Sequence, residues 1–318
     1  MSAVTIGEVM VELSAGPDGR FGLAFGGDTF NTAVYLARCG VATSYATALG
    51  DDGFSVKVAG FAEAEDIARA AVLRAPGRTM GLYLIETDAR GERRFTYWRD
   101  TSPARDLFEL DGWATVAETI VAAKLVLVSG ITLSLYSDTG LGRLFATLEE
   151  ARRAGASIAF DGNFRPRGWK GVLERARRLY LMALARADVA LPSADDEAAL
   201  FGDVSPVATL ERISKAGPRE IVVKMGAEGA IVATAAGVER VPVPEAITPV
   251  DTTAAGDSFD AGYLAARMKG ATPVEAALAG HRLAGVVVQH RGAVVPMEAT
   301  LQACRAIRDF IPARTRAS

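Results

Sequence analysis

Short runs of apolar residues alternate with segments of helical periodicity through the middle of the chain, and this alternation limits the fold more than any other feature. Apolar runs at 125–128 and 157–160 are followed by 138–154 and 171–185, in which apolar positions recur at helical spacing. Runs that are apolar throughout are typical of parallel strands covered on both faces. We therefore predict an α/β fold with a doubly wound, mostly parallel central sheet flanked by helices.

One stretch departs from this alternation. Residues 78–99 form two β-like runs around a turn at 88–91, and no helical segment follows them. Further β-like runs precede the first helical segment. Together they predict a small second sheet, built from about 9–27 and 78–102, that projects from a single domain of residues 1–318. Because such a sheet has an exposed face and free edges, we expect a homodimer through it.

Length and composition restrict the class of protein. The chain has 318 residues, half of them hydrophobic, and a net charge of −3. Nucleic-acid-binding proteins usually carry a basic excess, so we expect no nucleic-acid partner. Cys39 and Cys304 do not provide a disulfide framework, and His281 and His290 do not join them in a zinc-binding spacing. The absence of a secretory signal or a membrane-length apolar run predicts a cytoplasmic protein without a membrane partner.

The most specific local signal is the run Asp-Thr-Thr-Ala-Ala-Gly-Asp at 251–257, which leads into a helical segment. The small residues Ala254, Ala255 and Gly256 let the backbone approach a ligand. The unpaired N–H groups of a first helical turn favour an anion, for which phosphate is the usual candidate. Asp257 follows in the same turn, where it can accept a proton from a hydroxyl group that attacks a phosphoryl group. The alternative is that Asp257 only caps the helix.

A second run, Gly-Gly-Asp-Thr-Phe-Asn at 26–31, precedes the first helical segment. Gly27 allows a tight turn beside a ligand, and Asp28 and Asn31 offer polar groups to its hydroxyls. The two runs, in this order, resemble the signatures of the ribokinase, or phosphofructokinase-B, family of sugar kinases. The resemblance implies a ribokinase-like fold, whose small sheet acts as a lid over the sugar. It also implies an ATP-dependent carbohydrate kinase that uses Asp257 as its base.

The family resemblance gives roles to two other segments. Lys224, Gly226 and Gly229 follow an expected strand, and in this family the equivalent turn lies against ATP. Ser193 and Asp196 have the spacing of a family motif that organises Mg²⁺ through water, so Asp196 is the expected metal-binding residue. The alternatives are a tight β-turn for the first segment and a helix N-cap for the second. ATP and Mg²⁺ are the implied cofactors, and a monovalent cation stays open.

Arginine and tyrosine side chains predict the nature of the acceptor. Tyr83, Tyr97 and Arg99 fall on the small sheet, whereas Arg165 follows a core strand at the edge where α/β sites form. A neutral sugar has no need of two guanidinium groups, but a carboxylate is bound by them through charge-assisted hydrogen bonds. We therefore predict a sugar acid as the acceptor. The alternative for Arg99 is a salt bridge with a neighbouring acid such as Asp100.

Over essentially its whole length the chain is similar to the branch of the family that phosphorylates 2-keto-3-deoxygluconate. The matching runs lie at 26–29, 81–83, 97–99, 164–169 and 251–259. The similarity implies contacts to the sugar acid from Gly27, Asp28, Asn31, Tyr83, Tyr97, Arg99, Arg165 and Asp257. It implies contacts to ATP from Asn163, Arg165, Ser193, Lys224, Gly226, Gly229, Ala254 and Gly256, with an anion hole at Ala254, Ala255 and Gly256.

The predicted reaction transfers the γ-phosphoryl group of ATP to the 6-hydroxyl group of 2-keto-3-deoxy-D-gluconate, giving 2-keto-3-deoxy-6-phosphogluconate and ADP. Two alternatives stay open at this point. The first is a fructokinase or another kinase of a neutral sugar, which a comparison of acceptors would distinguish. The second, from a different class, is a sugar-acid sensor that binds its ligand without turnover, although the intact Asp257 favours an enzyme.

Overall fold

The computed structural model describes residues 2–16, 19–87 and 93–312, so the turn predicted at 88–91 lies outside the described residues. The main sheet contains the strands β1 (Ser2–Ile6), β4 (Ala42–Leu49), β5 (Ile67–Ala68), β6 (Val72–Arg74), β9 (Leu125–Ser129), β10 (Ser157–Asp161), β11 (Val189–Ala190), β12 (Glu220–Lys224), β13 (Ala230–Thr234) and β14 (Gly237–Val241). Their order is β14-β13-β12-β11-β10-β9-β1-β4-β5, and β6 also pairs with β4. Each neighbouring pair is parallel except β12–β13 and β13–β14, which confirms the predicted mostly parallel sheet.

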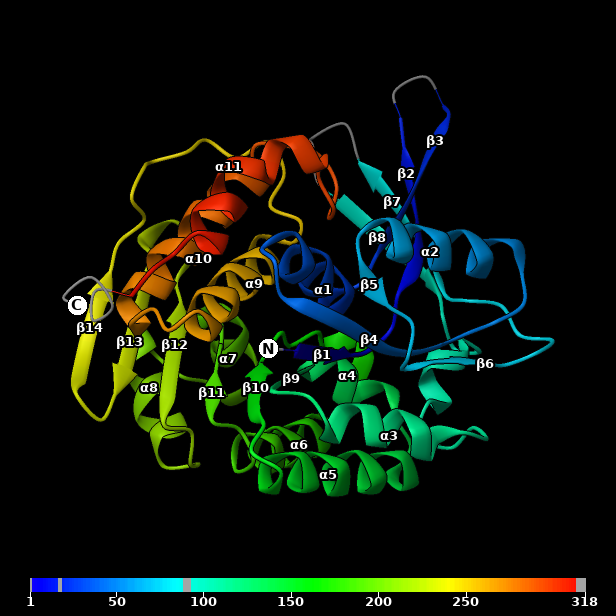
Figure 1. Cartoon of the computed structure of the whole chain (residues 1–318), viewed down its shortest axis with the longest axis horizontal. Coiled ribbons are helices and arrows are strands. Elements are labelled where there is room, and N and C mark those ends of the chain that lie inside the picture. The colour runs from blue at the N-terminus through cyan, green and yellow to red at the C-terminus, as the bar shows by residue number, and fades with distance from the viewer. Residues whose placement is uncertain (1, 17–18, 88–92, 313–318) are drawn as a thin grey trace.

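Helices cover both faces of the main sheet (Figure 1). The helices on one face are α3 (Trp113–Val121), α4 (Gly130–Leu135), α5 (Asp138–Arg153), α6 (Leu173–Leu184), α7 (Ala194–Phe201) and α8 (Pro206–Ser214). The helices on the other are α1 (Asp28–Arg38), α2 (Gly53–Ala64), α9 (Ala255–Met268), α10 (Pro273–Val287) and α11 (Met297–Arg308). In β9, Val126 and Val128 are buried in the first layer and Leu125 and Leu127 in the second, so the strand is apolar throughout. Across the described ranges, none of the helices combines the length and apolar character needed to cross a membrane.

Side-chain caps explain why several helices begin where the sequence predicts. Asp52 accepts hydrogen bonds from the backbone at the start of α2, and Ser137 does so at the start of α5. Thr272 and Glu275 form a reciprocal capping box at the start of α10. The observed α5 begins and ends within one residue of the helical segment predicted at 138–154, and α6 within two residues of the segment predicted at 171–185. The sequence analysis did not predict α3 or α8.

The strands β13 and β14 were also not predicted, and they add antiparallel pairs at one edge of the main sheet. The chain reverses between β12 and β13 at Gly226 and Gly229, whose φ values of 57° and 97° lie in the left-handed region. A connection this short joins antiparallel strands, whereas a parallel pair needs a long crossover. The mostly parallel sheet therefore ends in a small antiparallel extension at β12–β14.

Helices α9 and α10 pack at very close range where two glycines meet. A Cβ atom added to Gly262 would lie 3.0 Å from the Cα of Gly280. A Cβ atom added to Gly280 would lie 2.8 Å from the carbonyl oxygen of Phe259. The close approach holds α9 firmly against α10 along the buried face that both helices share.

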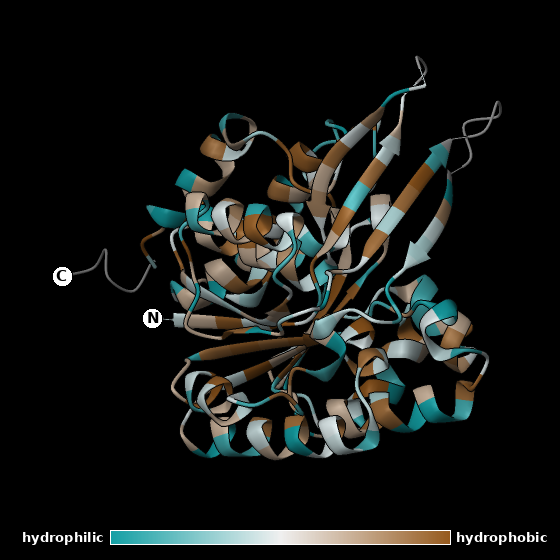
Figure 2. Ribbon diagram, turned by 90° about the vertical axis from the view of Figure 1, so that its right-hand side faces the viewer, coloured by the Kyte–Doolittle hydropathy of each residue, from teal (hydrophilic) through white to brown (hydrophobic). Residues whose placement is uncertain are grey.

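Four strands form a second sheet, which we call the lid sheet. Its strands are β3 (Phe21–Gly26), β2 (Met10–Ala15), β7 (Leu82–Thr87) and β8 (Arg93–Trp98), in that order. The central pair β2–β7 is parallel, and the outer pairs are antiparallel. All four strands fall within the predicted segments 9–27 and 78–102. Figure 2 shows them projecting from the body of the protein, as a lid would.

The two faces of the lid sheet differ in character. On one face, Val11 and Leu82 pack near the base of the sheet with apolar side chains of α1 and α2. On the opposite face, Tyr83 and Phe95 contribute to a small cluster of their own. Alternation along each strand therefore separates a face that joins the core from a face that carries the predicted tyrosine contacts.

Candidate active site

The strand order of the main sheet reverses at β1, which lies between β9 and β4. In doubly wound folds, ligands bind outside the carboxyl ends of the strands at such a reversal. Three polar side chains lie at these ends: Glu8 follows β1, Ser129 ends β9 and Asp161 ends β10. All three are buried. The topology therefore places a polar crevice at the base of the lid sheet.

The run 251–257 forms the beginning of α9, as predicted. Ala254 precedes the helix with φ at 58°, a left-handed conformation that costs roughly 1–2 kcal/mol for a residue other than glycine. The Ala255 N–H group donates to the carbonyl oxygen of Thr252 at 3.2 Å, so this member of the predicted anion hole is already engaged. The N–H groups of Ala254, Gly256 and Asp257 find no acceptor in the part of the chain that the structure describes. These amides can receive an anion.

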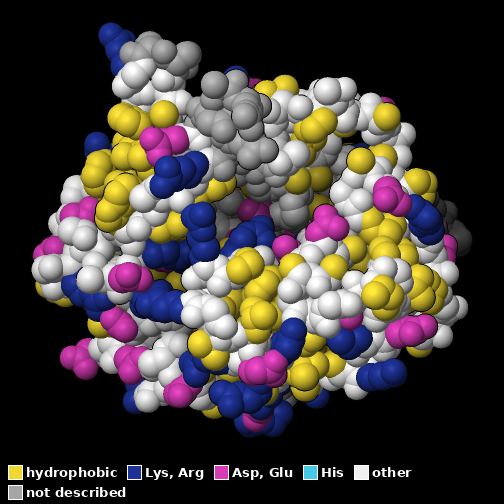
Figure 3. Space-filling model, turned by 180° about the vertical axis from the view of Figure 1, so that it is seen from behind, with side chains coloured by type: hydrophobic (Ala, Val, Ile, Leu, Met, Phe, Trp, Pro, Cys, Tyr) yellow, Lys and Arg dark blue, Asp and Glu magenta, His cyan; other side chains and the backbone are white. Residues whose placement is uncertain are grey.

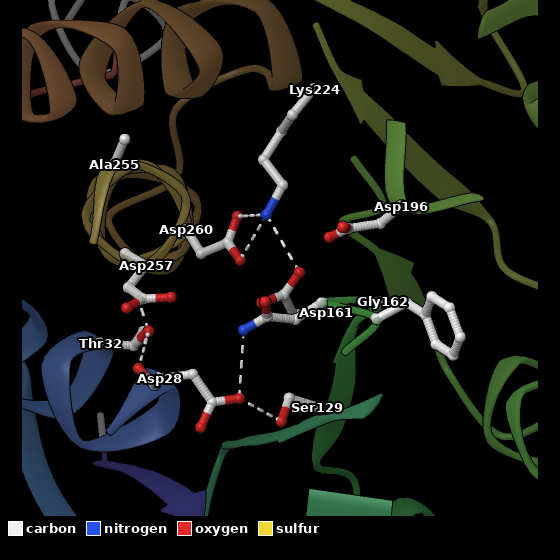
Figure 4. A network of polar contacts seen from close by, with 12 residues as sticks. Asp28, Thr32, Ser129, Asp161, Gly162, Asp196, Lys224, Ala255, Asp257 and Asp260 are labelled. Carbon is white, nitrogen blue, oxygen red and sulfur yellow. Dashed lines mark hydrogen bonds and ion pairs between the residues drawn. The ribbon is translucent and has the colours of Figure 1, made fainter. Parts of the chain in front are cut away.

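Asp257 is held by α1, the helix that follows the other predicted motif. Asn31 Nδ2 donates to Asp257 Oδ2 at 2.8 Å. Thr32 Oγ1 donates to the Asp257 carbonyl oxygen at 3.3 Å (Figure 4). Burial, with a further contribution from the negative charge of Asp28, raises the pKa of Asp257 to about 7. A carboxylate with that pKa is suited to accept a proton near neutral pH. The structure thus joins the two predicted motifs through a base and its supporting amide.

Asp28 lies deeper, between β9 and the segment after β10. It accepts hydrogen bonds from Ser129 Oγ at 2.5 Å and from Asn163 Nδ2 at 3.2 Å. Burial raises the pKa of Asp28, although the hydrogen bond from Ser129 opposes the rise. Asn163 has φ at 39°, so its backbone is also left-handed. Strained conformations of this kind cluster at ligand-binding sites, and here they occur at Asn163 and Ala254, two predicted ATP contacts.

Lys224 is buried among acids rather than extended toward solvent. Its Nζ lies 3.1 Å from Asp161 Oδ1 and 2.9 Å from both carboxylate oxygens of Asp260 (Figure 4). Burial alone would lower the pKa of Lys224, but Asp161 and Asp260 outweigh it and raise the pKa. A Cβ atom at Gly256 would lie 3.7 Å from Nζ, so the ammonium group also adjoins the first turn of α9. Its positive charge therefore supports an anion at that turn.

Arg165 and Asp196, predicted for different ligands, contact each other. Arg165 Nη1 lies 3.2 Å from both carboxylate oxygens of Asp196, and the arginine side chain is 56% exposed. Ser193 occupies the N-cap position of α7, as the alternative predicts, but its side chain makes no capping hydrogen bond. No group of three or more His, Cys, Asp or Glu side chains is arranged around a metal position within the described residues. Mg²⁺ does not require such a group, because it retains several waters and binds substrate phosphates together with one or two carboxylates.

The two glycines predicted to border ATP have different surroundings in the structure. A Cβ atom at Gly226 would meet nothing within 4 Å, so the backbone there is open to a ligand. A Cβ atom at Gly229 would lie 2.2 Å from the carbonyl oxygen of Val241, on β14. Packing against β14 is therefore sufficient to explain Gly229, whereas Gly226 has the open surface that a nucleotide contact requires.

The predicted contacts on the lid sheet already have partners within the protein. Arg99 forms an ion pair with Glu8, rather than with Asp100. The Tyr83 hydroxyl donates to the Glu12 carboxylate on the neighbouring strand. Tyr97 is 41% exposed, and its ring lies 5.9 Å from the Arg99 guanidinium carbon. The substrate would therefore meet Tyr97 freely, but it would have to share Tyr83 and Arg99 with acids.

Four side chains of this site were not predicted: Glu8, Ser129, Asp161 and Asp260. The first three lie where buried strands end, which is a signal that the sequence offers. Asp260 follows Asp257 by three residues and shares its side of the helix. Seen from behind, charged side chains of both signs gather around a hollow near the middle of the molecule (Figure 3). The site is thus more acidic than the sequence analysis expected.

Comparison with known proteins decides the family. The family model described as pfkB family carbohydrate kinase matches residues 2–300. The chain belongs to the pfkB family of carbohydrate kinases. Among its relatives, the 2-dehydro-3-deoxygluconokinase of Escherichia coli is 41% identical over 92% of this chain and 97% of its own length. The fructokinase of Klebsiella pneumoniae is 29% identical over 82% of each chain.

Solved structures of the pfkB fold superimpose along almost the whole chain. A PfkB protein from Polaromonas has a TM-score of 0.80 with 28% identity, covering 91% of this chain and 96% of its own. The 2-dehydro-3-deoxygluconokinase of Thermotoga maritima has a TM-score of 0.81 with 21% identity, covering 96% and 98%. A ribokinase from E. coli, solved with ATP and Mg²⁺, has a TM-score of 0.81 with 22% identity, covering 96% and 98%. These likenesses confirm the predicted ribokinase-like fold.

Proposed function

We propose that this kinase transfers the γ-phosphoryl group of ATP to the 6-hydroxyl group of 2-keto-3-deoxy-D-gluconate, also called 2-dehydro-3-deoxygluconate. The observation that carries the proposal is the 41% identity, over nearly the full length of both chains, with a kinase named for that sugar acid. The geometry agrees, because a buried carboxylate with a pKa of about 7 adjoins unpaired amides at a helix start. The products would be 2-keto-3-deoxy-6-phosphogluconate and ADP.

In the proposed mechanism, Asp257 accepts the proton of the 6-hydroxyl group as that oxygen attacks phosphorus. Asn31 fixes the carboxylate through its hydrogen bond of 2.8 Å. The N–H groups of Ala254, Gly256 and Asp257 stabilise the charge on the transferred group, with Lys224 behind the first turn of α9. Apart from Ala254, which directly precedes α9, each of these groups belongs to the helices α1 and α9 or the main sheet, so the arrangement is held on rigid elements.

The remaining predicted ATP contacts follow β10, β11 and β12, at the carboxyl ends of the parallel strands. Asn163 and the open backbone at Gly226 would border the nucleotide, and Asp196 would hold Mg²⁺ through water. Mg²⁺ would neutralise phosphate charge, which a site so rich in acids requires. The likeness to a fold solved with ATP and Mg²⁺ supports this assignment. We place the reaction in the cytoplasm, where ATP is available, and an assay without potassium would test a monovalent-cation requirement.

We assign the sugar acid to the space beneath the lid sheet, with Gly27, Asp28 and Asn31 on the core side. Its carboxylate would lie toward Arg99 and Arg165, and the wall would include Tyr97. Each arginine already contacts an acid, Glu8 or Asp196. The substrate carboxylate would therefore join or replace an existing partner rather than meet a free cation.

A panel of acceptors, assayed by coupled ADP detection, tests the proposed substrate. We expect 2-keto-3-deoxygluconate to be turned over with a kcat/KM well above those of fructose and other neutral sugars, with the C4 epimer included to measure strictness. Arg165→Ala should lower kcat/KM for the sugar acid by about 2 kcal/mol, roughly 30-fold, through the lost charge-assisted bonds. Arg305→Ala, which removes an exposed arginine of α11, is the control.

Preference for fructose would establish the neutral-sugar alternative. Binding of the sugar acid without ADP release would establish the sensor. An equal loss for acid and neutral sugars in Arg165→Ala would contradict the carboxylate contact.

We also propose that two copies pair through the lid sheet. Phe21, Leu23 and Trp98 lie on the same face and are 56%, 46% and 57% exposed. Seen from behind, apolar side chains gather over the lid region (Figure 3). Trp98→Glu should convert a dimer to a monomer in sedimentation at micromolar concentration, whereas Val204→Glu, on an exposed loop, should leave the dimer intact. A wild-type protein that sediments only as a monomer would refute this pairing.

A further inference from the structure

Glu8 is a buried acid for which the proposed reaction has no direct use. It follows β1, at the point where the chain leaves the main sheet for the lid sheet. Its side chain is 0% exposed, and apart from one ion pair neither carboxylate oxygen has a hydrogen-bond partner in the described part of the chain. Its ion-pair partner is Arg99, which directly follows β8 and is 19% exposed. Without Arg99 the buried charge of Glu8 would strongly destabilise the fold, so we expect the two side chains to stay paired.

The backbone around Glu8 is shaped to admit its carboxylate. A Cβ atom at Gly81 would lie 2.6 Å from Glu8 Oε1 and 3.1 Å from Arg99 Cβ. A Cβ atom at Gly27 would lie 2.1 Å from the Glu8 carbonyl oxygen. Gly27 lies where the chain returns from the lid sheet, and Gly81 lies where it enters β7. The ion pair therefore occupies the junction of the lid sheet with the core.

Arg99 has a second acid within electrostatic reach. The positive charge of Arg99 opposes the rise in the pKa of Asp28, so the two groups interact. Asp28 already accepts hydrogen bonds from Ser129 and Asn163 and belongs to the predicted sugar site. Without Glu8, nothing at the junction would oppose the attraction of Asp28 on the guanidinium, and we expect the arginine to shift toward the predicted sugar site.

We propose that Glu8 is a positioning residue that holds the Arg99 guanidinium away from Asp28 and directed at the substrate carboxylate. This inference rests on the proposed function, because it takes Arg99 to bind a sugar acid. Glu8 uses one edge of the guanidinium, and arginine has further N–H donors for a second carboxylate. The acid thus acts through Arg99 and touches neither the reacting atoms nor ATP.

Glu8→Gln keeps the size of the side chain and removes its charge. We expect KM for the sugar acid to rise about tenfold or more, with kcat within about threefold of wild type and KM for ATP unchanged. The decisive measurement is a double-mutant cycle with Arg99→Met. In the Arg99→Met background, Glu8→Gln should have no further effect on KM for the sugar acid, because the group it positions is gone.

Glu65→Gln is the matched control, because Glu65 forms a buried ion pair at 2.6 Å with Arg38, at the opposite end of α1 from Asp28 and Asn31. It should lower the thermal unfolding temperature without changing KM. If Glu8→Gln does not fold, Glu8→Asp retains the charge and enters the same cycle, with a smaller rise in KM. Equal effects of the Glu8 variant in both backgrounds, an unchanged KM or a matching rise in KM for ATP would overturn the proposal.

The acceptor panel is run first, so the two proposals fail separately. If the wild-type enzyme prefers a neutral sugar, the proposed function fails, and the cycle is measured on that sugar. If the effects of Glu8→Gln and Arg99→Met on KM for that sugar are coupled, Glu8 still positions Arg99, although the acceptor is not a sugar acid. If the enzyme prefers the sugar acid but the cycle is additive, only the role of Glu8 fails.

Discussion

Replacing Asp257 with asparagine is expected to lower kcat by about 10²–10⁴-fold, the range typical of a positioned general base. Asparagine has nearly the same shape and can still contact Asn31, which bonds to the carboxylate at 2.8 Å. The variant should therefore fold and bind ATP normally while it fails to accept the proton of the attacking hydroxyl group. Coupled ADP release at saturating substrate measures the loss, and calorimetric titration with ATP checks that binding is intact.

The pH dependence of the wild-type enzyme provides an independent check on Asp257. A base must be unprotonated to act, and the pKa of Asp257 is raised to about 7. We therefore expect kcat/KM to fall as the pH decreases through about 7, whereas the residual activity of Asp257→Asn should lack this limb. Asp138→Asn removes another first-turn acid, at the exposed start of α5, and should leave the profile unchanged. Turnover near the wild-type value in Asp257→Asn would exclude Asp257 as the base.

Replacing Lys224 with methionine is expected to lower the free energy of unfolding by about 3–5 kcal/mol. Methionine fills a similar volume, but Asp161 and Asp260 would stay buried without the ammonium group that contacts both of them. Urea unfolding followed by circular dichroism measures the change. Because Lys224 also adjoins the first turn of α9, we expect kcat to fall in the variant that remains folded at low urea.

The pH dependence of the stability loss shows whether the loss comes from the unpaired buried carboxylates or from lost packing. Burial already raises the pKa of Asp260 and Lys224 opposes the rise, so without the ammonium group the folded-state pKa of Asp260 rises further above its unfolded value. A group with a raised pKa binds its proton more tightly when folded, so its penalty is absent at low pH and grows as the pH increases. The stability gap between Lys224→Met and wild type should therefore widen from pH 5 to pH 8.

Lys215→Met, at the exposed end of α8, is the control and should change stability little at any pH. A stability gap for Lys224→Met that stays constant with pH would mean that packing, rather than the two buried carboxylates, accounts for the loss.

Much of the architecture could be predicted because its signals are local. The apolar run of β9 and the periodicity of α5 are properties of consecutive residues, and both were predicted within one residue. The antiparallel strands β13 and β14 were missed because their direction depends on the left-handed turn at Gly226–Gly229. The helices α3 and α8, of nine residues each, were missed as well.

The site was predicted less completely, because its contacts join distant parts of the chain. Asn31 and Asp257 were both predicted, but the hydrogen bond between them spans 226 residues and has no local signature. The partner of Arg99 could not be deduced either, since the arginine is paired with Glu8, which is far away along the chain but lies at the same end of the lid strands, rather than with its sequence neighbour Asp100. Local pattern identifies the residues that bear charge, whereas tertiary packing decides which charges meet.

The glycine contact between α9 and α10 bears on how the enzyme takes up its substrates. Because Gly262 and Gly280 bring these two helices into direct contact, we expect the start of α9 to stay in place when a phosphate binds. The amides and Asp257 therefore form a stationary half of the cleft. We expect opening and closing to be carried by the projecting strands alone, so mutations at their junction with the core should alter the rate of substrate capture more than the chemical step.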